Sequence, residues 1–259
     1  MSTSGTVELQ VRDQVATILF NRPDRHNAMT WSMYESLSHY CEQIATDPSV
    51  RVAVLRGHGG KAFVAGTDIE QFQAFKTGED GVAYERKIDR LVDQVEQLPI
   101  PTIAVIEGWC MGGGMAIASA CDFRLGTPHA RFGVPIARTL GNCLSLANTR
   151  RLAAGLGVAG AKRMLLGAET LDGQDALDAG FLYALASPEE IEKKTEALCR
   201  QLSALAPLTQ HAAKAMIREV MTRDGLDTDA LIAGCYGSAD FREGVDSFMK
   251  GRPAVWSGS

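Results

Sequence analysis

Apolar and polar residues alternate along the start of the chain. The apolar positions are Val7, Leu9, Val11, Val15, Ile18 and Phe20, and a polar break at residues 12–14 divides them. A period of two is typical of strands with one buried face, so this stretch predicts a β-hairpin. Pro23 should end it, because proline has no N–H to donate to a sheet.

Helical and strand patterns then alternate along residues 30–106. Residues 30–46 carry apolar side chains at helical spacing, with Thr30 suited to the N-cap. A β-branched run at 50–55 predicts a strand, residues 81–98 predict a second helix, and the apolar run 102–106 predicts a strand buried on both faces. Strands separated by helices imply an α/β core with parallel, right-handed crossovers.

The pattern changes in the last third of the chain. Two long amphipathic stretches, 188–205 and 207–221, follow one another without a strand pattern between them, and residues 235–256 are helical before an aromatic and basic end. We therefore predict an α/β core over residues 1–200 and a helical C-terminal region over residues 201–259.

Composition narrows the class of protein and of partner. The 259 residues are 46% hydrophobic and 22% charged, with a mean hydropathy of −0.04, which is ordinary for a soluble globular protein. A formal net charge of −5 gives no field that attracts phosphate backbones, so we expect no nucleic-acid partner. Because no apolar run approaches the ~20 residues of a membrane span and the N-terminus lacks a signal pattern, we expect a cytoplasmic protein without a membrane partner.

Cysteines and histidines are scattered along the chain. Neither set has metal-ligand spacing, so no metal site is predicted. The cysteines are expected to be buried free thiols. Cys143 is a weak candidate for a nucleophile, because no histidine lies near it in the sequence to activate it.

The strongest chemical signal lies in residues 102–118, where a buried strand runs into Gly112-Gly113-Gly114 and the glycines open a helix. The first N–H groups of a helix are unpaired and carry partial positive charge, which suits an anion or a polarised oxygen. A turn that merely needs small residues is the alternative. Ile117 replaces the last glycine of G-x-G-x-x-G and no Lys-Ser/Thr pair follows, which disfavours phosphate loops and a nicotinamide-dependent oxidoreductase.

A second strand-to-helix corner occupies residues 61–69, with small residues at its bend. On adjacent parallel strands, two such corners would each aim one backbone N–H at the same carbonyl oxygen. That arrangement is an oxyanion hole, which stabilises the negative charge that develops on a thioester oxygen.

Several short motifs occur in a characteristic order. They are Asn21-Arg22-Pro23, Asn27-Ala28, Ala65-Gly66-Thr67-Asp68-Ile69, Gly112-Gly113-Gly114, Cys121-Asp122, Phe132-Gly133-Val134-Pro135, and Phe241-Arg242-Glu243-Gly244-Val245 followed by Phe248, Lys250, Arg252 and Pro253. In these motifs the chain resembles the crotonase (enoyl-CoA hydratase/isomerase) superfamily over nearly its whole length.

The resemblance implies a crotonase-type spiral of ββα turns with C-terminal helices that build a homotrimer or a homohexamer. It implies an acyl-CoA ligand, and no cofactor beyond the coenzyme A that the substrate carries. The backbone N–H groups of Thr67 and Gly113 would be the oxyanion donors. The implied substrate-binding residues around them are Arg25, Ala28, Ala65, Asp68, Ile69 and Gly112. Lys250 and Arg252 would approach the CoA phosphates, or else are solvated charges of the tail.

Three positions depart from the family pattern. Family hydratases carry two glutamates that move protons, but the matching residues are Ala116 and Ile136, which cannot do so. Other members use an aspartate where this chain has Ser145. The proton-transfer residue is therefore unknown, and the enzyme is expected to catalyse decarboxylation, thioester hydrolysis or another enolate reaction. A non-catalytic acyl-CoA-binding or assembly subunit is the alternative.

Residues 135–145 differ most from the family and are expected to line the acyl pocket, beginning with Pro135 and Ile136. Arg138 would pair with a carboxylate or carbonyl of the acyl group, or form a salt bridge on a helix surface. Asn142 would hold a water or a substrate oxygen, or cap a helix.

Three side chains near the two corners also have two interpretations each. Trp109 forms a wall of the pocket or packs without contacting substrate. The Thr67 hydroxyl bonds the substrate or fills space. Glu70 is a catalytic acid or base, or an acid favoured by the dipole at the start of a helix.

Overall fold

The computed structural model describes residues 5–223, 225 and 228–259, and in these residues the strands assemble into two sheets. The larger sheet has the order β1 (Thr6–Arg12), β2 (Val15–Asn21), β3 (Val52–Gly57), β5 (Thr102–Ile106), β7 (Phe123–Gly126), β10 (Ala184–Leu185). The smaller sheet has the order β4 (Ala62–Val64), β6 (Trp109–Met111), β8 (Arg131–Gly133), β9 (Thr170–Asp172). The α-helices are α1 (Trp31–Thr46), α2 (Gly78–Glu96), α3 (Gly113–Ala120), α4 (Ile136–Thr139), α5 (Leu146–Leu165), α6 (Gly173–Asp178), α7 (Ile191–Ser203), α8 (Pro207–Thr222), α9 (Thr228–Gly237) and α10 (Ala239–Lys250), with 3-10 helices at η1 (Pro23–Arg25) and η2 (Ile69–Ala74).

The first two strands form the predicted hairpin. They are antiparallel, with Val7 opposite Phe20 and Leu9 opposite Ile18. β2, β3, β5 and β7 then pair in parallel, as the alternation of strands and helices predicts. The prediction of an α/β core with parallel crossovers is confirmed.

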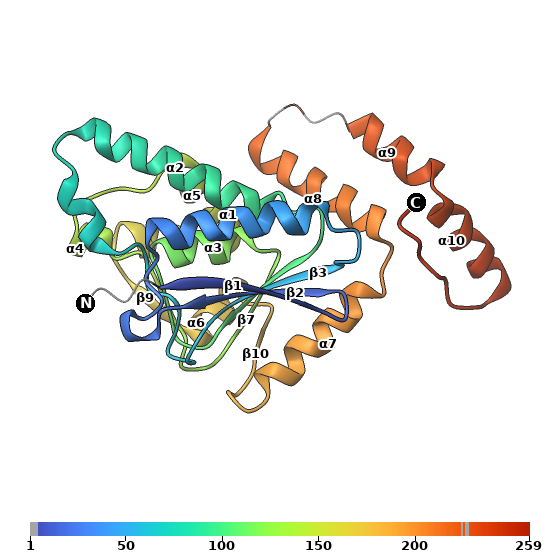
Figure 1. The fold of residues 1–259 in the computed structure, drawn as a ribbon, viewed down its shortest axis with the longest axis horizontal. Helices are drawn as coiled ribbons and strands as arrows, with labels where there is room; N and C mark the ends of the chain where they lie inside the picture. Colours follow the sequence, from blue (N-terminus) through green and yellow to red (C-terminus); the bar gives the residue numbers. More distant parts are fainter. Residues whose placement is uncertain (1–4, 224, 226–227) are drawn as a thin grey trace.

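Helices cover both faces of the larger sheet, which explains its apolar central strands. Ala104 and Ile106 of β5 belong to a buried cluster shared with α1 and α2, whereas Ile103 and Val105 pack in a second cluster with α7. Figure 1 shows α1, α2 and α3 on one side of the sheet and α7 on the other. A strand covered on both faces has no position that faces solvent, and residues 102–106 are buried throughout as predicted.

Side-chain caps set where the first two helices begin. α1 starts after Thr30 as predicted, because the Thr30 hydroxyl accepts a hydrogen bond from Met33 N–H at 3.3 Å. α2 starts earlier than predicted, at Gly78, because the Asp80 carboxylate accepts from Thr77 N–H at 2.8 Å and holds the preceding turn.

Two local predictions are wrong. β5 does not run into the triple glycine; it ends at Ile106, and the separate strand β6 carries the chain to Gly112. Gly108 permits this turn, because a Cβ at that position would lie 2.0 Å from the Lys61 carbonyl oxygen. The cysteines are not all buried either, since Cys143 is exposed on the segment before α5.

The C-terminal third is helical, as predicted. α7 and α8 occupy the two amphipathic stretches, and Figure 1 shows α9 and α10 extending beyond α8, away from the sheets. The predicted boundary at residues 200 and 201 falls inside α7, and the division into two regions stays a prediction. Residues 1–4, the start of the sequence searched for a signal, and the Phe248 side chain lie outside the described residues.

Two negative findings apply to the described part of the chain. None of its helices combines the length and the hydropathy of a membrane span. Its histidine, cysteine, aspartate and glutamate side chains form no group of three or more that would hold a metal ion.

Candidate active site

The two glycine corners lie side by side at one edge of the smaller sheet. β4 and β6 are parallel neighbours, with Ala62 paired to Trp109 and Val64 to Cys110, so both strands deliver the chain to the same edge. Gly66 follows β4 with φ of +107°, and Gly112 follows β6 with φ of +48°. These left-handed values favour glycine, and they bend both corners back over the strand ends.

The glycines also permit the close approach of α3 to β4. A Cβ on Gly114 would lie 2.0 Å from the Val64 carbonyl oxygen, and one on Gly113 would lie 2.5 Å from the Tyr34 hydroxyl and 3.6 Å from Thr67 N. The start of α3 is therefore in contact with the second corner. The small residues serve this approach as well as the turn.

The amides of Thr67 and Gly113 are the predicted donors, and neither donates a hydrogen bond within the described part of the chain. Met29 N–H donates to the Gly66 carbonyl at 2.8 Å, and Asp68 N–H donates to the Met29 carbonyl at 2.9 Å. This parallel bridge turns the intervening Thr67 N–H away from Met29. Gly113 is the first residue of α3 and has no acceptor within the helix. Among the described residues neither N–H has an acceptor, and their role as a donor pair stays a prediction.

A cluster of three hydroxyl groups surrounds the side chain of Thr67. Its Oγ1 lies 2.9 Å from the Tyr34 hydroxyl on α1 and 2.7 Å from the Tyr84 hydroxyl on α2. Burial raises the pKa of Tyr84 to about 12 and that of Tyr34 further still, so both phenols stay protonated. Three hydroxyl protons serve two hydrogen bonds, which leaves one proton for another acceptor.

Sequence reasoning missed both tyrosines. Each belongs to an amphipathic helix, where an aromatic residue is an ordinary core position. Their meeting at Thr67 depends on how α1 and α2 pack, and no local pattern signals it. The structure adds a third interpretation of the Thr67 hydroxyl to the two given by the sequence. The hydroxyl forms hydrogen bonds with Tyr34 and Tyr84 within the fold.

The residues that the resemblance assigns to CoA binding are brought together by two loops. They are Arg25 and Ala28 before α1, and Ala65, Asp68 and Ile69 after β4. Ala65 N–H donates to the His26 carbonyl at 3.1 Å, which joins the loops next to the Met29 bridge. Arg25 and Ile69 are exposed and Ala28 and Ala65 half-buried, so the joined loops present a surface beside the Thr67 corner.

Asp68 and Glu70 have structural partners in this surface. Asp68 lies 2.6 Å from the buried Arg22 guanidinium and accepts from Glu70 N–H at 3.1 Å, at the start of η2. Burial alone would raise the pKa of Asp68, but the bonds to Arg22 and to the backbone lower it, so the carboxylate stays charged. Glu70 is exposed and lies 3.7 Å from Arg25, which fits the structural interpretation of this residue.

The resemblance assigns the family glutamates to residues 116 and 136, and neither residue carries a carboxylate. Ala116 is buried in the first turns of α3, and Ile136 is half-buried at the start of α4 after Pro135. Gly112 N–H donates to the Gly133 carbonyl at 2.9 Å, which ties the corner to the strand that precedes Pro135. Trp109, at the start of β6, is 44% exposed.

An apolar cavity of about 550 Å³ opens between η2, α2 and the segment before α5. Its lining consists of Phe72, Phe75, Gly78, Gly81, Val82, Tyr84, Glu85, Arg86, Asp89, Leu140, Asn142, Cys143, Leu144 and Ser145. Tyr84 belongs both to this lining and to the hydroxyl cluster at Thr67, so the cavity adjoins the glycine corners.

The predicted pocket segment contributes to this cavity in part. Asn142 lines it, but Trp109, Pro135, Ile136 and Arg138 do not. Arg138 is exposed and makes no salt bridge within the described residues. The N-cap of α5 is Ser145, whose Oγ accepts a hydrogen bond from Asn148 N–H at 3.1 Å. The alternative prediction, that Asn142 caps a helix, is therefore wrong.

Two carboxylates in the cavity were also missed. Glu85 Oε2 accepts from Ser145 N–H at 2.8 Å, and Asp89 Oδ1 accepts from the Ser145 hydroxyl at 2.6 Å. Burial in the apolar lining raises the pKa of Glu85, the Ser145 N–H opposes this, and the negative charge of Asp89 adds to it. In the sequence both residues look like ordinary acids of an amphipathic helix.

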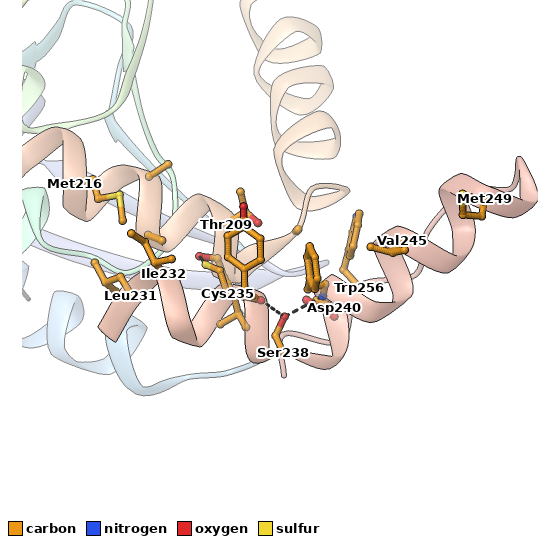
Figure 2. Close-up of a pocket in the computed structure, with 17 residues that line it drawn as sticks. Thr209, Met216, Leu231, Ile232, Cys235, Ser238, Asp240, Val245, Met249 and Trp256 are labelled. Carbon is orange, nitrogen blue, oxygen red and sulfur yellow. Dashed lines mark hydrogen bonds between the residues drawn. The ribbon is translucent and has the colours of Figure 1, made fainter. Parts of the chain in front are cut away.

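A second apolar cavity, of about 680 Å³, lies between α8, α9 and α10 (Figure 2). Met216, Leu231, Ile232, Val245 and Trp256 are among its lining. Lys250 and Arg252 lie in the same region and form ion pairs with acids of α10, which fits the interpretation as tail charges.

Comparisons with known proteins agree on one family. The enoyl-CoA hydratase/isomerase family model matches residues 10–259. A probable enoyl-CoA hydratase of Bacillus subtilis is 31% identical over 98% of this chain and 99% of its own length, and a crotonyl-CoA hydratase of Syntrophomonas wolfei is 29% identical over 95% of each. The crystal structure of an enoyl-CoA hydratase/carnithine racemase from Magnetospirillum magneticum matches with a TM-score of 0.90 and 30% identity, over 98% of this chain and 96% of that one. The chain belongs to the enoyl-CoA hydratase/isomerase family of the crotonase superfamily, with its α/β fold, and is an acyl-CoA enzyme.

Proposed function

We propose that the enzyme binds an acyl-CoA thioester with its carbonyl oxygen between the backbone N–H groups of Thr67 and Gly113. The proposal is carried by the two adjacent corners, each of which holds an N–H without an acceptor in the described chain. Donors fixed in this way gain strength as negative charge develops on the oxygen, because no reorganisation is needed. The chemistry needs no cofactor beyond the coenzyme A of the substrate.

The reaction is proposed to pass through an enolate without the hydration step of the related hydratases. Ala116 and Ile136 lie where those enzymes are expected to carry their glutamates, and neither side chain transfers protons. Decarboxylation fits this site, since loss of CO₂ forms the enolate directly. Thioester hydrolysis or another enolate reaction also fits.

CoA binding is proposed at the joined loops beside the Thr67 corner. Arg25 offers an exposed guanidinium, and the half-buried Ala28 and Ala65 leave the backbone accessible to adenine or pantetheine. Asp68 supports this surface through Arg22. From there the acyl group would pass the Thr67 and Gly113 amides and enter the cavity that Asn142 lines.

The oxyanion donors are tested with two variants at one position. Gly113→Pro removes the N–H, and proline suits the first position of a helix. Gly113→Ala adds the same Cβ next to the Tyr34 hydroxyl but keeps the N–H, so the pair isolates the donor. A panel of acyl-CoA thioesters, malonyl-type esters included, identifies the substrate by mass spectrometry.

We expect Gly113→Pro to turn over that substrate about 10²–10³-fold more slowly than Gly113→Ala, with similar affinity for the thioester. Circular dichroism checks that both variants fold. Equal rates in the two variants contradict the oxyanion assignment, and binding of the panel without consumption of any member favours a non-catalytic subunit.

We propose that α8, α9 and α10 (residues 207–250) form the assembly region of a homotrimer or homohexamer. This part of the chain exposes Ile217, Val220, Tyr236, Val245 and Met249, and the last three line the cavity of Figure 2. Exposed apolar patches of this kind mark protein interfaces. Light scattering after size-exclusion chromatography measures the assembly, and a monomeric wild-type protein contradicts it.

A further inference from the structure

We infer that the Glu85 carboxylate transfers the proton at the α-carbon of the bound acyl thioester, in place of the two glutamates that the family pattern leads us to expect. The inference rests on the proposed function and names the residue that the sequence leaves unidentified. Glu85 comes from α2, an element in which no family motif lies.

The cavity that Glu85 lines adjoins the oxyanion corner through Tyr84. Tyr84, the residue before Glu85, lines the same cavity and places its hydroxyl 2.7 Å from Thr67 Oγ1. The negative charge of Glu85 also acts on both phenols that bond to Thr67, since it raises the pKa of Tyr34 and of Tyr84. An acyl group that leaves the Thr67 amide and enters this cavity therefore passes toward Glu85.

The Glu85 carboxylate is held in place and still has an unoccupied oxygen. Its Oε2 accepts from Ser145 N–H at 2.8 Å, whereas Oε1 has no hydrogen bond within the described residues. Asp89 is the other acid in the cavity, but its Oδ1 accepts from the Ser145 hydroxyl at 2.6 Å and from Asn148 Nδ2 at 3.1 Å, which fixes it at the start of α5. Asp89 accepts two hydrogen bonds and Glu85 accepts one, so Glu85 is the less constrained of the two acids.

The surroundings of Glu85 suit proton transfer. Phe72, Phe75, Val82, Leu140 and Leu144 make most of the lining apolar, and a carboxylate in such a site is a stronger base than one in water. The titratable and charged groups that line the cavity with Glu85 are Tyr84, Arg86 and Asp89 from α2 and Cys143 from the facing segment. The phenol of Tyr34, on α1, also interacts electrostatically with Glu85. Burial and the Asp89 charge raise the pKa of Glu85.

The step balances with these groups alone. The Cα–H bond breaks, its proton forms an O–H bond on Glu85, and its electron pair moves into the thioester to give an enolate whose oxygen the Thr67 and Gly113 amides stabilise. In the reverse direction, the Glu85 carboxyl returns the proton to Cα. In decarboxylation the enolate forms by cleavage of the bond to CO₂, so Glu85 must first take a proton from water, and its carboxyl group then donates that proton to Cα.

Deuterium exchange measures this step whatever the natural reaction. The protein is incubated in D₂O with saturated acyl-CoA thioesters from acetyl-CoA to hexanoyl-CoA, and deuterium at Cα is followed by mass spectrometry. Glu85→Gln keeps the side-chain size and an oxygen acceptor for Ser145 N–H. Glu79→Gln, at an exposed acid in the first turn of the same helix, is the matched control.

We expect exchange by the wild type and by Glu79→Gln, and a fall of at least about 100-fold in Glu85→Gln with unchanged thioester affinity. The wild-type rate should rise with pH as Glu85 ionises, and this dependence should be absent from Glu85→Gln. A purely structural role for Glu85 does not produce that loss of pH dependence.

Three outcomes overturn the inference. Exchange by Glu85→Gln at the wild-type rate removes Glu85 from the reaction, and thioester binding without exchange by the wild type removes the proton transfer itself. Failure of the wild type to bind any of the thioesters instead removes the proposed function, which calorimetry distinguishes from the other two.

Discussion

The Tyr84 hydroxyl lies 2.7 Å from Thr67 Oγ1 and joins α2 to the corner whose amide is a proposed oxyanion donor. Tyr34 bonds to the same oxygen at 2.9 Å from α1. Two helices therefore fix the side chain of one residue in the turn. A side chain held from both sides keeps the neighbouring amide in a constant orientation, which is the preorganisation that an oxyanion hole requires.

Tyr84→Phe tests this relationship. The variant keeps the ring against Phe72 and removes one hydrogen bond worth about 1 kcal/mol, so we expect a loss of about 1 kcal/mol in the free energy of unfolding and a fall of about fivefold in kcat/KM. Denaturant titration and steady-state kinetics measure the two effects. Tyr40→Phe, at a half-buried residue whose hydroxyl makes no hydrogen bond within the described residues, should change neither.

Glu85→Gln should stabilise the folded protein at neutral pH. The pKa of Glu85 is raised on folding, so its contribution to stability is fully present below the unfolded value of 4.5 and is lost as the pH rises through the folded pKa. Glu85→Gln has no ionisable group at this position, so its free energy of unfolding does not decrease in this way as the pH rises. Denaturant titrations at about pH 7 and about pH 4 should show an advantage of Glu85→Gln at the higher pH only; an equal difference at both contradicts the raised pKa.

Asp68→Asn should destabilise the protein at neutral pH by about 2 kcal/mol, because it removes the carboxylate from the buried Arg22 guanidinium. The pKa of Asp68 is lowered on folding, so its contribution is present above the unfolded value of 3.8 and is lost as the pH falls through the folded pKa. The two proteins should therefore converge in acid. Asp13→Asn, in an exposed pair with Arg12, should change stability by less than about 0.5 kcal/mol and serves as the control.

Gly114→Ala should prevent the close packing of the two corners. The Cβ of the new alanine would lie 2.0 Å from the Val64 carbonyl oxygen. Relieving this contact requires a shift of the backbone of α3 or of β4, which is unfavourable. We expect a loss of about 3 kcal/mol in the free energy of unfolding. Gly234→Ala, in α9, meets nothing within 4 Å and should be neutral or slightly stabilising, because alanine favours helix.

Crotonyl-CoA should be bound but hydrated slowly. Each general acid or base contributes about 10²–10⁴-fold to such a reaction, and residues 116 and 136 supply none. Loss of the enoyl absorbance measures hydration, with a crotonyl-CoA hydratase as the reference enzyme. Hydration at the rate of that reference overturns the proposed departure from hydratase chemistry.

The sequence predicted the hairpin, several of the helices and central strands, and both glycine corners, but not the chemical neighbours of those corners. Thr30 marked the start of α1, and the apolar run 102–106 marked a strand covered on both faces. In contrast, the sequence offered Asn142 for a capping role, and only the structure showed that Ser145 caps α5. Cys143 was expected to be buried and is exposed. The prediction failed because a single apolar residue in a loop belongs to no periodic pattern that would indicate its burial.

Local pattern was sufficient for the α/β core and the terminal helices, since periodicity is a property of the chain itself. The tertiary structure alone decided that Tyr34 and Tyr84 meet at Thr67 and that Glu85 lines the adjoining cavity. These residues come from two helices whose packing depends on the register of parallel strands far apart in the sequence. The helical periodicity of apolar residues predicts which face of a helix is buried, but it does not predict which side chains of other elements contact that face.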